Sequence, residues 1–246
     1  MPHEFELRKQ VTLKATPEQV WEAIATGPGI DSWFMGRNEI EPRQGGATRQ
    51  YFGDVPVEAT VSAWEPARRF AFRSDPAQDG SFMAFEYLIE ARGQGTTVLR
   101  MVQSGILGDD WEAEYDGLSR GWDMYLHTLG QYLTHFQGRH AVVVFALRPG
   151  EAGHGPAWAA LERGLGLTGP VARGERVRLT PDGFGPIQGV ADYVLPDFLG
   201  VRTGDGLYRF IRGTHDTLVV GHHLFADIDA KRAEQDWQDW LDALDV

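Results

Sequence analysis

The chain has 246 residues, 42% of them hydrophobic and 24% charged, so it can bury one large core or two smaller ones. Its formal net charge of −12 argues against nucleic acid and anionic membranes as partners, because both attract clustered Lys and Arg. The absence of cysteine excludes disulfides, thiolate metal ligands and a cysteine nucleophile. The N-terminus does not read as a signal peptide, and no apolar run approaches the roughly 18 residues of a membrane helix, so we expect a cytoplasmic protein.

A strand and two helices are expected first. Apolar residues mostly alternate from Phe5 to Ala15, the pattern of a strand with one buried face. Thr16–Gln19 predicts a helix start, because its threonine can cap, its proline suits the first helical position and its glutamine completes a capping box. We expect this helix to end at Gly27–Gly29 and a short second helix to span about Ile30–Phe34.

Alternation returns after Pro56 and predicts several antiparallel strands. They cover Val57–Ala63, Phe70–Phe72, Met83–Ile89 and Thr97–Ser104. Two glycines between the last two strands predict a hairpin turn.

A long helix is expected from about Trp111 to Phe136. Its apolar residues recur at spacings of three and four: Leu118, Trp122, Tyr125, Leu126, Leu129, Leu133 and Phe136. This face must be buried, and the concave side of the predicted sheet is the available surface.

The second half of the chain repeats the first in shortened form. Residues 56–66 align without a gap on residues 186–196, and later matches follow in the same order with loop deletions. The region 27–51 shrinks to 164–176. We therefore predict an α+β protein with two domains, 1–138 and 139–246, the second an abridged copy of the first.

The first half also resembles a known family. Thr16-Pro17-x-x-Val20-Trp21, the pair Trp33-Phe34 and the helix motif 121–126 are similar to those of bacterial relatives of the activator of Hsp90 ATPase. These proteins belong to the START-like, or SRPBCC, superfamily of helix-grip (Bet v 1-like) folds. The resemblance spans about residues 5–136. It implies a curved antiparallel sheet around a long C-terminal helix, with an apolar cavity between them that binds lipids, polyketides or other hydrophobic molecules. It also implies that a minority of members are enzymes and that co-chaperone activity belongs to one branch.

Aromatic side chains from elements expected to face one another are the candidate ligand-binding residues. With one methionine, they are Trp33, Phe34, Tyr51, Trp64, Phe72, Phe85, Met101, Trp122 and Tyr125. For each of these residues, the alternative interpretation is an ordinary position in a solid hydrophobic core. Arg73 and Arg100 could present a charge to an acidic ligand, but we expect both to point outward.

No catalytic residue, metal ligand or cofactor site is predicted. The sequence has no Gly-x-Ser-x-Gly elbow, phosphate-binding loop or dinucleotide fingerprint. His222 and His223 are adjacent in a predicted strand and so point to opposite faces, which favours a structural role over shared metal binding.

Three functional hypotheses follow. The first is non-catalytic binding of a small hydrophobic or amphipathic molecule, which needs a cavity of about 300 Å³ or more. The second is a chaperone-associated interaction module, with a protein partner or a homodimer and an exposed apolar patch. The third is an enzyme of the polyketide cyclase or dehydratase kind, which needs a polar group with a perturbed pKa inside the cavity.

Overall fold

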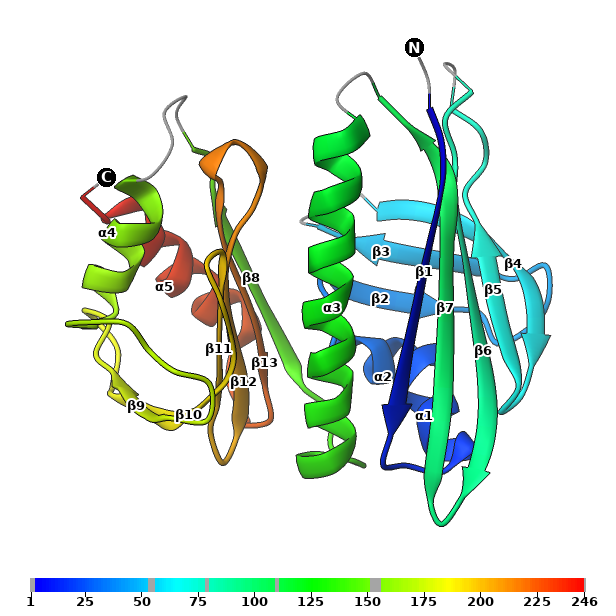
Figure 1. Ribbon diagram of the computed structural model, residues 1–246, viewed down its shortest axis with the longest axis horizontal. Coiled ribbons are helices and arrows are strands. Elements are labelled where there is room, and N and C mark those ends of the chain that lie inside the picture. Colours follow the sequence, from blue (N-terminus) through cyan, green and yellow to red (C-terminus); the bar gives the residue numbers. More distant parts are fainter. Residues whose placement is uncertain (1–2, 53–55, 78–79, 109–110, 151–155, 246) are drawn as a thin grey trace. The chain divides into compact units, whose positions relative to one another are not determined.

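The computed structural model describes residues 3–52, 56–77, 80–108, 111–150 and 156–245. The chain divides into two compact units, Met1–His140 and Ala141–Val246. Each unit contains one antiparallel sheet with helices, so the fold class is α+β as predicted (Figure 1).

The described residues of the first unit form seven strands and three helices. In chain order these are β1 (His3–Leu13), α1 (Pro17–Ala25), α2 (Gly27–Asp31), β2 (Arg37–Ile40), β3 (Ala47–Tyr51), β4 (Pro56–Glu65), β5 (Arg69–Arg73), β6 (Met83–Gly93), β7 (Thr96–Leu107) and α3 (Trp111–His135). The sheet order is β1-β7-β6-β5-β4-β3-β2, so the first strand pairs with the last and the others follow as a meander.

The capping box at the start of α1 is confirmed. Thr16 Oγ1 accepts a hydrogen bond from the Gln19 amide, and the Thr16 amide donates to Gln19 Oε1 at 2.7 Å. The predicted start of the second helix was wrong, since α2 begins at Gly27 and not at Ile30. Thr26 caps it by accepting from the Gly29 amide. A Cβ at Gly27 would lie 2.3 Å from the Asn38 carbonyl oxygen, a contact between distant segments that local sequence does not reveal.

The long helix forms where its periodicity predicted. The buried residues of α3 include Trp122, Tyr125, Leu126, Leu129 and Leu133. Trp122 faces the rings of Phe85 and Tyr87 on β6, with centroids 6.1 and 6.4 Å apart. The sheet and this helix therefore form the helix-grip arrangement expected from the resemblance.

In the part of the second unit that the structure describes there are six strands and two longer helices. They are β8 (Val142–Arg148), α4 (Pro156–Gly164), β9 (Arg176–Leu179), β10 (Ile187–Leu195), β11 (Phe198–Arg202), β12 (Gly206–Arg212), β13 (Leu218–Leu224) and α5 (Ala230–Asp242), with a 3-10 turn at Thr214–Asp216. The sheet order is β8-β13-β12-β11-β10-β9. This is the order of the first sheet with one strand fewer, and α2 has no counterpart among the described residues.

A β-bulge recurs at the same place in both sheets. The register between β4 and β5 shifts between Val61 and Ala63, and that between β10 and β11 shifts between Ala191 and Tyr193. Val61 exchanges backbone hydrogen bonds with the turn at 45–46, and Ala191 exchanges the same pair with the turn at 174–175. The gap-free alignment of 56–66 on 186–196 thus matches the two bulges residue for residue. Since bulges are specific structural features rather than defects, the two sheets share more than their strand order.

The core of the second unit combines aliphatic side chains with a cluster of aromatic rings. Phe184 stacks on Trp237 with centroids 4.2 Å apart, and Trp237 packs edge-on against Trp240 at 5.3 Å. Phe210 and Leu241, both fully buried, belong to the same core.

Candidate ligand-binding site

A cavity of about 110 Å³ lies in the first unit, between the sheet, the α2 region and α3. Apolar side chains from these elements form most of its wall: Ile30, Trp33, Phe34, Ile40, Val57, Ala59, Phe72, Met83, Phe85, Tyr87 and Trp122. Polar residues from β2, β3 and β4 and the end of β5 complete it: Asn38, Glu39, Thr48, Arg49, Gln50, Glu58 and Ser74.

The α2 side of the cavity is held by one buried hydrogen bond. The Trp33 indole N–H donates to the Ala23 carbonyl oxygen at 2.8 Å, and the side chain is 1% exposed. This bond fixes the segment after α2 against α1. Phe34 then lies parallel to Trp122 of α3, with centroids 5.1 Å apart.

The α3 side is fixed by a second buried bond. The Trp122 indole N–H donates to Gln103 Oε1 at 2.6 Å, and Gln103 Nε2 contacts the Met83 sulfur at 3.6 Å. Nearer the surface, Lys9 Nζ binds both Ser119 Oγ and Asp123 Oδ1. These contacts set the rotation of α3, so that Trp122 faces the sheet.

The cavity does not reach the roughly 300 Å³ that the binding hypothesis requires in the sequence analysis. The reason is that rings stack across the space and do not only line its edge. Phe34 stacks on Trp122, and Phe72 stacks on Phe85 with centroids 4.9 Å apart.

Tyr87 brings a polar group to this apolar wall. The residue is 4% exposed, and its ring stacks with Phe70 on the neighbouring strand. Among the described residues its hydroxyl has no hydrogen-bond partner. Burial alone raises the pKa of Tyr87, so the phenol is protonated at physiological pH.

Charged residues on the polar side pair with one another. Arg49 Nε donates to Glu58 Oε1 at 2.9 Å, and Glu39 accepts from Arg37 Nη1 at 2.6 Å. The Tyr51 hydroxyl donates to the other oxygen of Glu39 at 3.0 Å. Because these pairs are largely solvent-exposed, they give the cavity a polar rim and not a buried charge.

A half-buried carboxyl lies just behind this rim. Asp31 Oδ1 accepts from both the backbone amide and the side-chain amide of Asn38, at 2.8 and 2.9 Å. Burial raises the pKa of Asp31 to about 6, against the lowering effect of these hydrogen bonds.

Five of the nine sequence-predicted residues line the cavity: Trp33, Phe34, Phe72, Phe85 and Trp122. The other four lie elsewhere in the first unit. Tyr125 packs behind Phe34 at 4.7 Å, Trp64 packs on Trp21, Met101 is fully buried, and Tyr51 binds Glu39 at the surface.

Tyr87 and Ile30 are lining residues that sequence reasoning missed. A signal for Tyr87 existed, since it follows Phe85 by two positions on one strand and therefore shares its face. Neither arginine considered for an acidic ligand lines the cavity: Arg73 covers the Phe82 ring, and Arg100 pairs with Glu90 at 2.8 Å.

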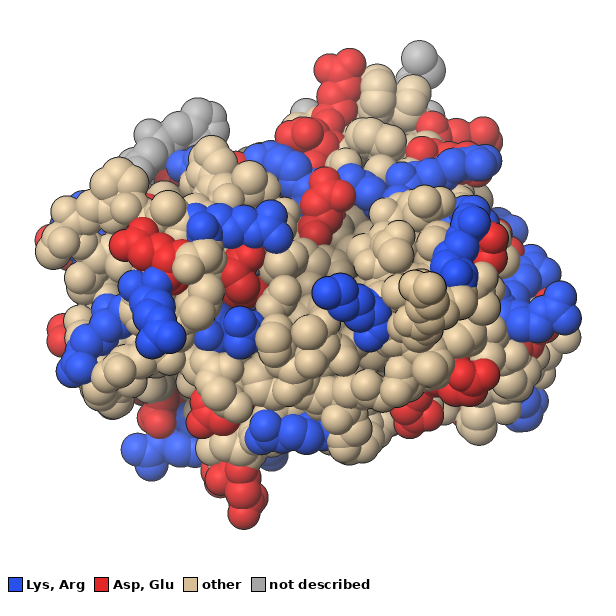
Figure 2. Space-filling model, turned by 60° about the horizontal axis from the view of Figure 1, so that its bottom comes forward, with Lys and Arg blue, Asp and Glu red and all other residues tan. Residues whose placement is uncertain are grey.

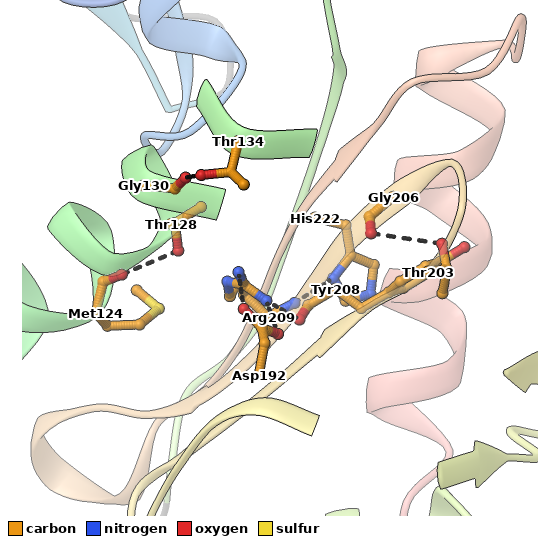
Figure 3. A network of polar contacts seen from close by, with 10 residues as sticks. All are labelled: Met124, Thr128, Gly130, Thr134, Asp192, Thr203, Gly206, Tyr208, Arg209 and His222. Carbon is orange, nitrogen blue, oxygen red and sulfur yellow. Dashed lines mark hydrogen bonds and ion pairs between the residues drawn. The ribbon is translucent and has the colours of Figure 1, made fainter. Parts of the chain in front are cut away.

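A histidine whose pKa is clearly shifted, His222, lies in the second unit (Figure 3). His222 Nδ1 accepts from the Arg209 backbone amide at 3.0 Å, and the imidazole packs among Tyr208 and Trp237. Burial lowers the pKa of His222 well below its usual value. Nearby, the Arg209 guanidinium makes two hydrogen bonds to Asp192, at 2.8 and 3.0 Å.

Within the part of the chain that the structure describes, no group of three or more His, Cys, Asp or Glu side chains is placed to hold a metal ion. No helix of the same residues is long and apolar enough to cross a membrane.

Residues 14–134 match the sequence model of the activator of Hsp90 ATPase homolog 1-like proteins. The first unit belongs to this family. The match begins at the end of β1 and stops at the end of α3, and so includes every residue that lines the cavity. A search of curated proteins found no match to the chain.

Several solved structures align with this family member. Protein MLL2253 from Mesorhizobium loti is 24% identical over 54% of this chain and 98% of its own, with a TM-score of 0.47. The Aha1 dimer from Colwellia psychrerythraea is 18% identical over 52% and 96%, with a TM-score of 0.42. DynU16, a protein in the dynemicin biosynthetic locus, is 20% identical over 96% of both chains, with a TM-score of 0.46.

Proposed function

We propose that the first unit binds a small, largely apolar molecule without catalysing a reaction on it. The observation that carries the proposal is the cavity itself, walled by Phe34, Phe85 and Trp122 and opening on a polar rim. An enclosed apolar wall with a few polar groups is typical of small-molecule sites. The paired charges give the mouth of the cavity a polar border, and the aromatic wall contacts the body of the ligand.

The size of the cavity limits the size of the ligand. Drug-sized ligands occupy pockets of about 300–1,000 Å³, whereas an apolar cavity of about 150 Å³ takes a single benzene ring. A cavity of about 110 Å³ is smaller still, so it encloses at most about one ring, and any substituent of a larger ligand would extend towards the polar rim.

The test is calorimetric titration of the protein with one-ring probes such as α-methylstyrene and acetophenone. Ala59 lines the cavity from β4, so Ala59→Leu places a larger side chain in it and should abolish saturable binding. Thr60→Leu is the matched control, because Thr60 is the exposed next residue on the same strand and should leave binding unchanged. No saturable binding of any probe by the unaltered protein would refute the proposal.

A chaperone-associated interaction is the second candidate, favoured by the name of the matched family. Its surface would include Phe52 and Val57, which follow β3 and begin β4 and are 39% and 58% exposed. Substitution of both residues by serine should then reduce stimulation of an Hsp90 ATPase. Absence of stimulation by the unaltered protein would eliminate this candidate.

We infer that the second unit is a shortened copy of the first with a supporting role. The shared strand order and the matching bulges at Val61 and Ala191 support a common origin. The region that carries Trp33 and Phe34 in the first unit has no helical counterpart among the described residues of the second. The rings of Phe184 and Trp237 occupy its interior instead.

A further inference from the structure

The Tyr87 hydroxyl differs from the polar side-chain groups near it, because it has no hydrogen-bond partner among the described residues. Trp33 and Trp122 both donate their indole N–H groups to protein oxygens, and Ser74 Oγ accepts from the Met83 amide. Tyr87 is at least as buried as most of these residues, yet its hydroxyl has no partner among the described residues. The Tyr87 oxygen is not one of the fully buried side-chain atoms that lack a partner, so it keeps some accessible surface, and a group inside the cavity can reach it.

The chemistry around the hydroxyl indicates what would satisfy it. Its ring lies between Phe70 and Trp122, both apolar contacts. The charged residues that line the described cavity, Glu39, Arg49 and Glu58, all belong to the ion-paired rim. A charged ligand group beside Tyr87 would lose its hydration without gaining a counter-ion, which is strongly unfavourable. A neutral hydrogen-bond acceptor loses much less hydration free energy when it enters the same place.

Building on the proposed function, we infer that the Tyr87 hydroxyl anchors the ligand by donating a hydrogen bond to a neutral acceptor, such as a ketone or aldehyde oxygen. The ligand class is then a compact, uncharged carbonyl compound of about one ring. The apolar part lies against Phe34, Phe85 and Trp122, and the carbonyl oxygen points towards β6.

Two probes of nearly equal shape separate the anchor from apolar burial. Acetophenone carries a carbonyl oxygen where α-methylstyrene carries a methylene group. The ratio of their dissociation constants therefore measures the contribution of the hydrogen bond in each variant. The contribution of apolar contacts, which both probes make, largely cancels in this ratio. Tyr87→Phe should shift this ratio against acetophenone by about fivefold or more, as expected for loss of one buried hydrogen bond.

Tyr115→Phe is the matched control, because Tyr115 lies on α3 outside the lining residues and loses the same oxygen atom. It should leave the ratio unchanged. Tyr87→Phe removes an atom without a protein partner, so its melting temperature should equal or exceed that of the unaltered protein. This thermal measurement separates an effect on binding from an effect on folding.

Benzoate tests the requirement for a neutral ligand. At neutral pH it should bind at least about tenfold more weakly than acetophenone, because its charge has no counter-ion at the Tyr87 end of the cavity. Equal binding of benzoate would overturn the neutral class. An unchanged probe ratio in Tyr87→Phe would overturn the anchor while leaving the proposed function intact. If the unaltered protein binds neither acetophenone nor α-methylstyrene, the proposed function and the anchor fail together.

Discussion

Asp31 is the last residue of α2 and precedes the aromatic pair Trp33 and Phe34, which lines the cavity. It connects α2 to the start of β2 through its two hydrogen bonds with Asn38. Its pKa is about 6 in the folded protein against 3.8 when unperturbed, chiefly because of burial. Between these values the folded state binds more protons than the unfolded state. The stabilising contribution of protonation is therefore full below pH 4 and is lost as the pH rises through 6.

Asp31→Asn should remove the free-energy cost of burying a charged carboxylate, while it keeps a side-chain oxygen that can accept from Asn38. We expect the variant to be more stable than the unaltered protein at pH 7.5, by on the order of 1–2 kcal/mol, since one pKa unit corresponds to about 1.4 kcal/mol. The difference should shrink to near zero at pH 4. Urea unfolding at both pH values measures it. A difference that does not vary with pH would show that hydrogen bonding, and not charge, is responsible.

His222 should give the opposite pH dependence in the second unit. Burial lowers its pKa well below 6.5, so on acidification the unfolded state takes up a proton that the folded state does not. Stability from this group is full above pH 6.5 and falls below it, by at most about 1.4 kcal/mol per pH unit. Proton NMR should show the His222 ring resonances unchanged from pH 8 to 5.5. A titration midpoint near 6.5 would contradict the burial of this imidazole.

At the level of single elements, the capping box of α1 offers a clean stability test. Thr16 and Gln19 each satisfy the backbone amide of the other. Thr16→Ala should lower the free energy of unfolding by about 1 kcal/mol, the usual value of an N-cap. Thr134→Ala is the control, since this exposed threonine of α3 only bonds back to the Gly130 carbonyl oxygen. It should change stability by less than about 0.5 kcal/mol, because alanine favours the helix interior. Equal losses in both variants would rule out the capping box as the cause.

Elements with strong local signals were predictable from the sequence, and elements fixed by distant contacts were not. The capping box and the apolar stripe of α3 are local patterns, and both appear where expected. The start of α2 carries local signals too, since Thr26 caps it and Pro28 lies in its first turn, but the glycines at 27 and 29 predict a break instead. The close approach of Gly27 to the Asn38 carbonyl oxygen is visible only in the fold. The same limit applies to the cavity. Periodicity placed Trp122 and Tyr125 on one helix face, but only the stacking of Phe34 decides that Trp122 lines the space and Tyr125 lies behind.

For the whole molecule, the net charge of −12 has to be considered together with the distribution of the charges over the surface. On the face shown in Figure 2, acidic and basic side chains are interspersed and do not gather by sign. Ion pairs also join neighbouring strands, as between Arg69 of β5 and Glu86 of β6 at 2.7 Å. Such interspersed charges favour solubility, whereas a one-signed patch would favour a charged partner.

The division into two units predicts where binding activity resides. Every residue that lines the cavity falls between Ile30 and Trp122, inside Met1–His140. A compact unit with its own core can in principle fold alone, so we expect residues 1–140 to fold as an isolated fragment. This fragment should bind acetophenone within about twofold of the full chain, a difference of under 0.5 kcal/mol. Residues 141–246, in which Phe184 stacks on the core residue Trp237, should not bind it.

Circular dichroism and calorimetry on both fragments and the full chain give the answer. If residues 1–140 are folded but bind much more weakly than the full chain, the second unit contributes to the site and is more than a support. If residues 141–246 bind the probe, the second unit has kept a cavity of its own and the unequal roles proposed for the two units are wrong. Retention of binding by residues 1–140 alone would leave the second unit with a structural role, in accord with its loss of the α2 region.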